Sequence, residues 1–238
     1  MGEELASAVC RLSEEQRNSV IRYAAKVSWP AGFAIYQRGA PADGVFIVAR
    51  GRVVLRSRVR AGRGFIPWIA TCGETFGSEG LYPGGQYTTD ARSETETETL
   101  FLSGAKFRAF VREQPQHAIA VFNQLMAERS VLLDKLRELT TLSVEQRILS
   151  TLSRLAHTDI FANEQGETVL TPERYRLLCE LVGATRESVS LVINRLTSEG
   201  LVERRGATTV LAPIAKVVER ATPELELPAV GAVEQALQ

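Results

Sequence analysis

The hydrophobic pattern of this 238-residue chain changes from strand-like to helical at Pro115, and this change constrains the fold more than any other feature. From Trp29 to Leu102, short runs rich in β-branched and aromatic residues, such as Val45–Val48, are separated by single glycines. Such runs predict an antiparallel, jelly-roll-like β-roll. Beyond Pro115 the apolar residues recur with a helical period. The pattern therefore predicts an α+β chain in which the strands precede the long helices.

We expect four segments. Residues 1–115 form the β-roll together with N-terminal helices, and residues 116–140 form a long central helix. Residues 141–217 form a second helical domain, which ends in two strands. Residues 218–238 have breakers and no regular period, so we expect a loosely held tail. Serine and glutamine at capping-box spacing predict helix starts at Ser13 and Ser143.

The composition excludes several classes of protein. Lys plus Arg and Asp plus Glu are both 28, so the formal net charge is +0 and a histone-like polyanion binder is not expected. No apolar stretch approaches the roughly 20 residues of a membrane span. Residues 1–4 carry acid where a secretory signal carries base. We therefore expect a cytoplasmic protein that does not interact with membranes.

The residues that most often bind metals are few and scattered. Cys10, Cys72 and Cys179 form no Cys-x-x-Cys pair, which argues against a disulfide framework, an iron–sulfur cluster and a structural zinc site. His117 and His157 lie far apart in the sequence and have no neighbouring nucleophile. No HxxxH, GxSxG or P-loop pattern is present, so an enzyme is not indicated.

The central helix carries an apolar stripe in alternating steps of three and four residues, the spacing of the a and d positions of a coiled coil. Arg129 interrupts the stripe once, while Met126 and Leu133 widen it. The spacing favours association of two copies of the chain, and the alternative is a helix that packs only on its own domain. The predicted dimer seam consists of Phe122, Leu125, Arg129, Leu132, Leu136 and Leu139.

The segment from Thr88 to Leu100 is a polar run with little apolar content at either odd or even positions. It predicts a solvated edge strand whose charges discourage aggregation. The alternative is an acidic strip that docks a partner.

Two short helices meet at a glycine in the C-terminal domain. Thr171 followed by proline predicts the start of the first helix, and Gly183 predicts its end. Thr185 predicts the cap of a second helix, which Gly200 closes. With Leu178, Val182, Val189 and Val192 as interlocking apolar positions, this arrangement predicts a helix-turn-helix. Residues 201–211 follow as a two-stranded wing.

The second helix carries side chains suited to DNA at its N-terminal end. Arg186 can donate two hydrogen bonds to guanine, and Glu187 can accept one from the cytosine amino group. The alternative is an Arg-Glu pair on a solvated helix face. The candidate phosphate-binding residues are Ser188, Ser190, Arg195, Arg204 and Arg205.

These patterns occur in the order typical of the CRP/FNR family of bacterial transcription regulators, which the chain resembles up to about Val217. The resemblance rests on Pro30–Gly51, Gly73–Gly77, the helix after Pro115 and Gly183–Val189. It implies a β-roll sensor domain, a dimerisation helix and a winged helix-turn-helix. A homodimer of this kind binds a palindromic site in double-stranded DNA, and RNA polymerase is a further partner if the protein activates transcription.

The recognition helix departs from the family at one position. Leu191 stands where the cyclic-AMP receptor type has another arginine. This difference predicts a half-site that loses one guanine contact and presents a thymine methyl to the leucine.

The resemblance also bears on the effector. Cyclic-nucleotide-binding members carry Gly-Glu and, some residues later, Arg-Ser, which hold the cyclic phosphate. Here Gly77 is followed by Ser78 and Glu79, and Thr88 and Thr89 stand in place of Arg-Ser. The phosphate would therefore lack its cation.

Leu132 and Leu133 occupy the positions of the central helix at which cyclic-AMP-binding relatives offer hydroxyls to the purine. A small apolar or uncharged effector, or none, therefore fits this chain better than cyclic AMP. The candidate pocket consists of Phe76, Gly77, Ser78, Glu79, Thr88, Thr89, Leu132 and Leu133.

Other modes of sensing in the family need groups that this chain does not clearly offer. FNR-type iron–sulfur sensing needs an N-terminal cysteine cluster, which Cys10 alone cannot supply. Haem needs an axial ligand, for which only His117 and Cys72 are candidates, and a lone His or Cys is more often structural. The alternatives are a cyclic-nucleotide- or haem-responsive regulator of this fold, and a nucleotide-binding regulatory module without DNA binding.

Overall fold

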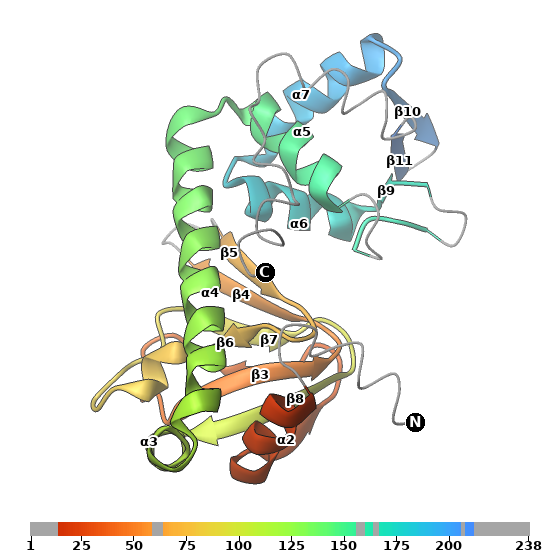
Figure 1. The fold of residues 1–238 in the computed structure, drawn as a ribbon. Coiled ribbons are helices and arrows are strands. Elements are labelled where there is room, and N and C mark those ends of the chain that lie inside the picture. The colour runs from red at the N-terminus through yellow and green to blue at the C-terminus, as the bar shows by residue number, and fades with distance from the viewer. Residues whose placement is uncertain (1–13, 59–63, 156–159, 164–166, 206–207, 212–238) are drawn as a thin grey trace. The chain divides into compact units, whose positions relative to one another are not determined.

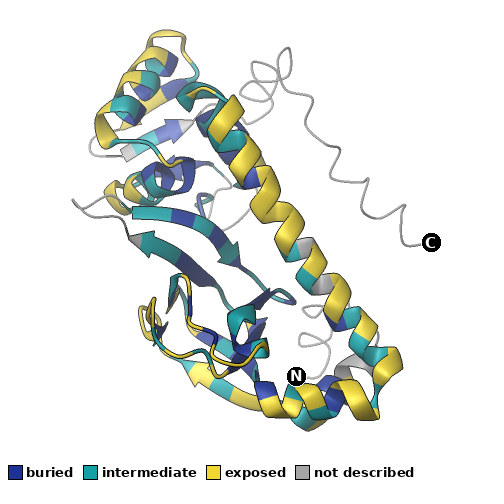
Figure 2. Ribbon diagram, turned by 90° about the vertical axis from the view of Figure 1, so that its left-hand side faces the viewer, coloured by how far each residue is buried: buried dark blue, intermediate teal, exposed yellow. Residues whose placement is uncertain are grey.

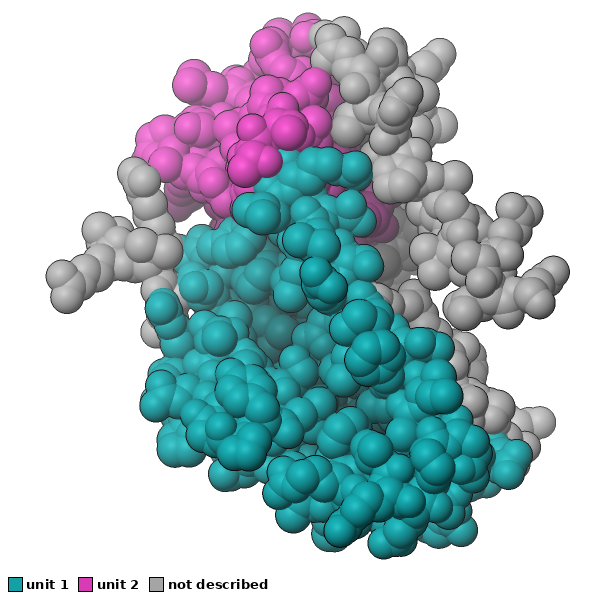
Figure 3. Space-filling model, turned by 60° about the vertical axis from the view of Figure 1, so that its left-hand side comes forward, with its two compact units in different colours: residues 1–137 teal, residues 138–238 magenta. Residues whose placement is uncertain are grey.

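A computed structural model describes residues 14–58, 64–155, 160–163, 167–205 and 208–211 (Figure 1). The predicted helix cap at Ser13 and the predicted tail 218–238 lie outside these residues. The chain divides into two compact units, residues 1–137 and 138–238, each of which is described by itself (Figure 3). In the described residues, no helix combines the length and hydropathy that a bilayer-spanning segment needs.

The first unit is the predicted antiparallel β-roll, and its two four-stranded sheets have the orders β1-β8-β3-β6 and β2-β7-β4-β5. The strands are β1 (Ala25–Trp29), β2 (Ala34–Tyr36), β3 (Gly44–Arg50), β4 (Val53–Arg58), β5 (Gly64–Ala70), β6 (Thr75–Phe76), β7 (Asp90–Ser93) and β8 (Thr97–Ser103). The helices are α2 (Glu14–Tyr23), the 3₁₀ helix η1 (Ser78–Leu81), α3 (Gly104–Glu113) and α4 (Pro115–Thr141), the last of which continues into the second unit.

Strand β3 joins two clusters of apolar side chains, because successive residues of a strand point to opposite faces of the sheet. Val45 and Ile47 pack with Val20 of α2, Phe110 of α3 and Val121 of α4. The second cluster consists of Tyr36, Phe46, Val48, Val53, Leu55, Trp68, Ala70, Phe76, Tyr87 and Ala91. The continuous apolar run of β3 is thus explained by burial on both faces.

The prediction of an edge strand between Thr88 and Leu100 is wrong. Strand β7 lies between β2 and β4, and β8 lies between β1 and β3. Thr97 and Thr99 are 1% and 0% exposed. The Thr97 hydroxyl donates to the backbone carbonyl of Arg52, and the Thr99 hydroxyl accepts from the indole N–H of Trp29 at 2.9 Å. Partners distant in sequence therefore satisfy the polar groups of an interior strand.

The second unit contains the predicted winged helix-turn-helix. Its elements are α5 (Val144–Leu155), β9 (Val169–Leu170), α6 (Pro172–Val182), α7 (Arg186–Ser198), β10 (Val202–Arg205) and β11 (Thr208–Leu211). The wing strands β10 and β11 pair antiparallel, and β9 adds a third strand to this sheet. The α5 capping box is present, since Ser143 and Gln146 exchange backbone-to-side-chain hydrogen bonds of 2.8 and 3.2 Å.

The core of the second unit lies among α5, α6 and α7. The buried residues include Leu178 and Val182 of α6 and Val189 of α7, as the sequence predicts. Val192 is only partly buried, and Ile193 takes the interior position instead.

We predict that Gly44→Ala destabilises the β-roll. A Cβ atom at Gly44 would overlap the carbonyl oxygen of Leu102 on β8, and the backbone of Gly80 lies against the same residue. The expected loss in the free energy of unfolding is about 3 kcal/mol. Urea titration followed by tryptophan fluorescence measures it, because Trp29 and Trp68 both lie in the first unit.

Gly39→Ala is the matched control. Gly39 has a φ of +82°, and a Cβ atom there would have no neighbour within 4 Å. The alanine is then disfavoured only by the left-handed backbone, which lowers the free energy of unfolding by about 1 to 2 kcal/mol. A Gly44→Ala protein as stable as the Gly39→Ala protein would contradict the close approach of β3 and β8.

Candidate nucleic-acid interface

Two capped helix ends fix where the recognition helix α7 begins. Gly183 ends α6 in the left-handed conformation with a φ of 61°, and its N–H donates to the carbonyl of Cys179. Thr185 then caps α7 by accepting a hydrogen bond from the backbone N–H of Ser188 at 3.2 Å. Because both ends have their caps, Arg186 and Glu187 occupy the first turn of α7.

Contacts with α5 hold this turn in place. The guanidinium of Arg147 donates to the carbonyl oxygen of Val182 at 2.8 Å and so satisfies one of the free carbonyls at the end of α6. Glu145 of α5 forms an ion pair with Arg195 of α7. The buried side chains of α7 include Ile193, so this helix has one fixed face and one exposed face.

The exposed face carries the predicted base readers. Arg186 and Glu187 are exposed, and Leu191, one turn further on, is 72% exposed. The guanidinium carbon of Arg186 lies 5.9 Å from the centroid of the Tyr175 ring, which is the geometry of a cation–π contact. Arg186, Glu187 and Leu191 thus offer a hydrogen-bond donor fork, a carboxylate and an apolar side chain on this face.

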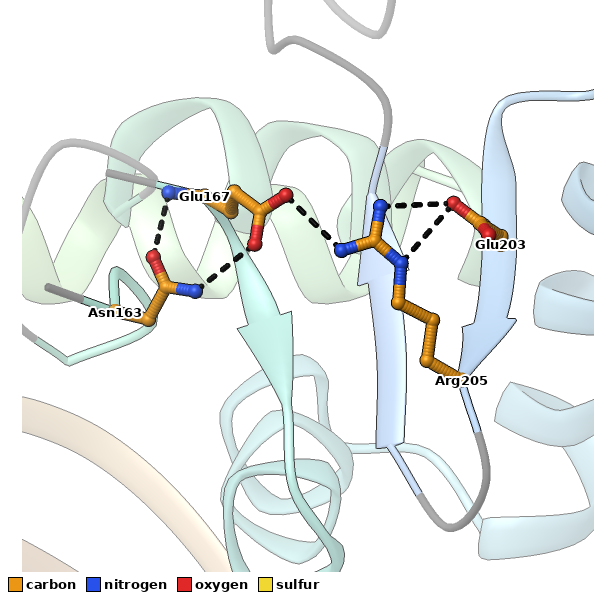
Figure 4. Close-up of polar contacts among 4 residues, drawn as sticks. All are labelled: Asn163, Glu167, Glu203 and Arg205. Atoms are coloured by element: carbon orange, nitrogen blue, oxygen red, sulfur yellow. Dashed lines mark hydrogen bonds and ion pairs between the residues drawn. The ribbon is translucent and has the colours of Figure 1, made fainter. Parts of the chain in front are cut away.

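Two of the four predicted DNA-binding arginines are already paired with carboxylates. Arg195 pairs with Glu145, as described above. Arg205 donates to Glu203 at 3.0 and 3.2 Å and to Glu167 at 3.1 Å (Figure 4). Asn163 donates to Glu167, and this bond together with Arg205 lowers the pKa of the Glu167 carboxyl. A fixed carboxylate pair therefore offsets the charge of Arg205.

Arg204, Ser188 and Ser190, which were also predicted to contact DNA, have neutral partners. Arg204 donates to the side-chain oxygen of Asn194 on α7. The hydroxyls of Ser188 and Thr185 lie 3.1 Å apart. Ser190 hydrogen-bonds to Tyr175. Tyr175 was not singled out in the sequence, since it lies on α6 and only the packing of α6 on α7 brings it to the interface.

Helix α4 carries the predicted dimer seam on an exposed face (Figure 2). Phe122, Leu132 and Leu136 are 57%, 41% and 57% exposed, and Arg129 is exposed as well. Leu125 and Leu139 are partly buried. Ile119, Met126 and Leu133 widen the exposed apolar surface. Within the first unit, this surface lies apart from the α4 residues that pack on the roll, of which Val121 is buried in the core.

In the cassette formed by Phe76–Glu79, Thr88 and Thr89 of the predicted effector pocket, a carboxylate of the protein itself occupies the hydrogen-bond donors of Thr88. Glu79 of η1 accepts hydrogen bonds from the backbone N–H of Thr88, at 3.0 Å, and from its hydroxyl. Phe76 is fully buried, and its ring lies against Phe46 with centroids 5.0 Å apart. Gly77 has a φ of 73° and directly precedes η1, whose first residue is Ser78. Thr89 hydrogen-bonds to Tyr36. The donors of Thr88 thus already hold a negative charge.

The α4 residue at this cassette is Glu128, which the sequence analysis missed. The Thr75 hydroxyl of β6 donates to Glu128 at 3.1 Å. Leu132 and Leu133, predicted for this place, are 41% and 53% exposed. Glu128 follows the buried Val121 by seven residues, or two helical turns, so both lie on the face of α4 that packs on the β-roll. The helical period would have predicted this position if that face had been known.

The surroundings of Glu128 favour its neutral form. Burial raises the pKa of the Glu128 carboxyl to about 7, and the negative charges of Glu79 and Glu74 raise it as well. The hydrogen bond from Thr75 acts in the opposite direction and lowers this pKa. Tyr36 of β2 also interacts electrostatically with Glu128. Burial raises the pKa of the Tyr36 hydroxyl well above its ordinary value.

The two haem-ligand candidates have partners of their own. The Nδ1 atom of His117 lies 2.7 Å from the Ser19 hydroxyl, and the Cys72 thiol donates to the carbonyl oxygen of Ala49 at 2.7 Å. In the part of the chain that the structure describes, no three His, Cys, Asp or Glu side chains form a group that could hold a metal ion.

Comparison with known sequences identifies both units. Residues 26–114 match the cyclic nucleotide-binding domain, and residues 146–215 match the Crp-like helix-turn-helix domain. The CRP-like cAMP-activated global transcriptional regulator of Mycobacterium tuberculosis is 23% identical over 200 residues, which are 82% of this chain and 87% of the relative. The cAMP-activated global transcriptional regulator CRP of Haemophilus influenzae is 25% identical over 190 residues, which are 77% and 82%.

Solved structures share the fold. The c-di-GMP responsive global regulator CLP of Xanthomonas campestris has a TM-score of 0.73 at 22% identity and covers 84% of this chain and 100% of its own. A transcriptional regulator of the CRP/FNR family from Thermus thermophilus has a TM-score of 0.70 at 24% identity and covers 83% and 98%.

We predict that Glu128→Gln changes how the stability of the first unit depends on pH. The folded protein disfavours ionised Glu128, so the wild type loses stability as the pH rises from the ordinary carboxyl pKa of 4.5 to about 7. Glutamine is neutral throughout. The variant should therefore gain on the order of 2 to 3 kcal/mol over the wild type between pH 4 and pH 8. Unfolding by urea at a series of pH values measures this gain.

Glu96→Gln serves as the control, because the Glu96 side chain is 80% exposed and its partner Arg50 lies at 4.0 Å. Its stability should follow the wild type at every pH. If the Glu128→Gln and wild-type curves run parallel, Glu128 is not held in its neutral form.

Proposed function

The chain belongs to the CRP/FNR family of transcription regulators, and from this premise we propose that it binds an inverted-repeat DNA site as a homodimer, with an effector other than cyclic AMP or none. It acts in the cytoplasm, and RNA polymerase is its further partner if it activates transcription. The observation that carries the proposal is the capped first turn of α7, where Arg186 and Glu187 are exposed together.

The chemistry of this turn matches base edges in a major groove. A guanidinium donates two parallel hydrogen bonds to guanine, and a carboxylate accepts from the cytosine amino group. Leu191 lies one turn from Glu187 and is 72% exposed, so it has an apolar surface to offer a thymine methyl. The proposed half-site therefore contains G·C pairs read by Arg186 and Glu187 next to an A·T pair.

The exposed surface of α4 supports the homodimer. Phe122, Leu132 and Leu136 follow the coiled-coil spacing, and each exposes at least two-fifths of its surface. Exposed apolar stripes of this kind favour burial against a second copy. Two-fold symmetry then presents two copies of α7 to half-sites about 34 Å apart, which is one turn of the duplex.

The cassette supports an effector without a phosphate at Thr88. In this chain the Thr88 donors bind Glu79, and Glu74 adds negative charge nearby. A phosphate placed there would displace a carboxylate and meet like charges, which is unfavourable in a poorly hydrated site.

The base-reading role predicts the behaviour of Arg186→Ala. We expect this variant to bind the site returned by a selection from random DNA about 1 to 3 kcal/mol more weakly than the wild type, and to relax the choice of base at one position of each half-site. Affinity for a scrambled duplex should change much less. Fluorescence anisotropy with both duplexes measures the two effects.

Arg154→Ala is the control of equal charge change, since Arg154 lies on α5 and pairs with Glu138. It should leave the preference for the selected site intact. Equal losses on selected and scrambled DNA with Arg186→Ala would overturn the assignment, and so would a selection that returns no inverted repeat.

The seam predicts that Leu136→Glu produces a monomer. A carboxylate at a position that is buried in the dimer loses its hydration without a partner, which costs several kcal/mol. Sedimentation velocity should show a shift from dimer to monomer together with weaker DNA binding. Val111→Glu on α3 is the control, because Val111 is 38% exposed and lies outside the seam. A Leu136→Glu protein that remains dimeric would place the interface elsewhere.

A further inference from the structure

A pocket of about 240 Å³ lies within the second unit, where α6, α7 and the wing sheet meet. Tyr175 of α6, Arg186 and Ser190 of α7, and Arg204 and Thr209 of the wing line it. None of the eight residues that line this pocket is acidic. The volume is several times the roughly 30 Å³ that one water occupies in the liquid, so a small polyatomic anion has room.

Neither arginine of this pocket forms an ion pair with a carboxylate of the described residues. Arg204 makes one hydrogen bond within the described residues, to the neutral amide of Asn194, although a guanidinium has five N–H donors. Arg186 lies against the neutral ring of Tyr175. Of the four arginines predicted to bind DNA, Arg195 and Arg205 have carboxylate partners, and these two do not line the pocket. Carboxylates thus offset the neighbouring arginines but not these two.

The hydroxyls of the pocket add donors that suit an anion. Burial raises the pKa of Tyr175, so its hydroxyl keeps its proton at neutral pH. Ser190 already hydrogen-bonds to that hydroxyl, and both residues line the pocket together with Arg186 and Arg204. Hydrogen bonds from arginine and hydroxyl donors to phosphate oxygens are stronger than those between neutral groups.

We propose that this pocket binds one phosphate group, with Arg204 as its main cation and the hydroxyls of Tyr175 and Ser190 as donors. The inference rests on the proposed function, because the expected source of the phosphate is the DNA backbone beside the bases that α7 reads. A free phosphate anion offers the same chemistry and is the other source. Arg204, rather than Arg205, is the wing residue that holds the phosphate.

The first test compares Arg204→Ala with Arg205→Ala in the full-length protein. Arg204→Ala should weaken binding to the selected and the scrambled duplex equally, by about tenfold or more. It should also reduce the slope of log affinity against log salt by about 1 for each protomer on the DNA. Arg205→Ala, adjacent in sequence but already paired, should change affinity by about twofold or less. Equal effects of the two variants would overturn the proposal.

The second test locates the phosphate. Neutral methylphosphonate linkages replace the phosphates of the selected duplex one at a time. One linkage in each half-site should weaken wild-type binding about tenfold and have no effect on Arg204→Ala. Tyr175→Phe, which keeps the ring beneath Arg186, should reduce the penalty at that same linkage. Circular dichroism melting checks that each variant is folded.

The third test separates the two sources of phosphate. Inorganic phosphate is titrated into the DNA-free protein and followed by ³¹P line broadening. Suppose that inorganic phosphate binds the wild type but not Arg204→Ala, while no methylphosphonate linkage has an effect that depends on Arg204. The pocket then binds a free phosphate anion and not the DNA backbone. If neither a linkage nor inorganic phosphate depends on Arg204, the proposal is wrong. Failure of the wild type to distinguish selected from scrambled DNA would instead overturn the proposed function.

Discussion

The recognition surface depends on the short turn between α6 and α7. Gly183 adopts a left-handed backbone that costs other residues about 1 to 2 kcal/mol, and the Thr185 side chain supplies the cap that lets α7 begin at the next residue. Arg147 completes the turn by donating to the last carbonyl of α6. Without this turn, Arg186 and Glu187 would not share the exposed first turn of a helix, and the chain would carry the residues of a DNA reader without their arrangement.

Electrostatic pairing then divides the arginines near this surface into two groups. Carboxylates pair with Arg195 and Arg205 and offset part of their attraction for DNA. Arg186 and Arg204 have neutral partners and line one pocket. A net charge of +0 is therefore compatible with DNA binding, because Arg186 and Arg204 place positive charge where α7 and the wing meet.

Local sequence signals predicted most of the fold and the place of Arg186 and Glu187 in the first turn of a helix. Glycine-separated runs, the capping box at Ser143 and the turn at Gly183 act over a few residues, and the structure contains each of them. The failures depend on distant contacts. The threonines of β8 were read as solvated because the sequence does not show the strands that cover them. Thr97 donates to Arg52, 45 residues away, as well as to Thr95, and Thr99 accepts from Trp29, 70 residues away. Arg205 pairs with Glu203, two residues away, but also with Glu167, 38 residues earlier. Glu128 accepts a hydrogen bond from Thr75 across 53 residues.

The central claim is that two copies of α7 read the major groove one helical turn apart. Protection of guanine N7 from methylation on the selected DNA tests this claim most directly, since N7 lies in the major groove. The account predicts two protected clusters centred about 10 base pairs apart on one face of the duplex, with the sequence between them open to methylation. A single protected cluster, or uniform protection along the duplex, would contradict it.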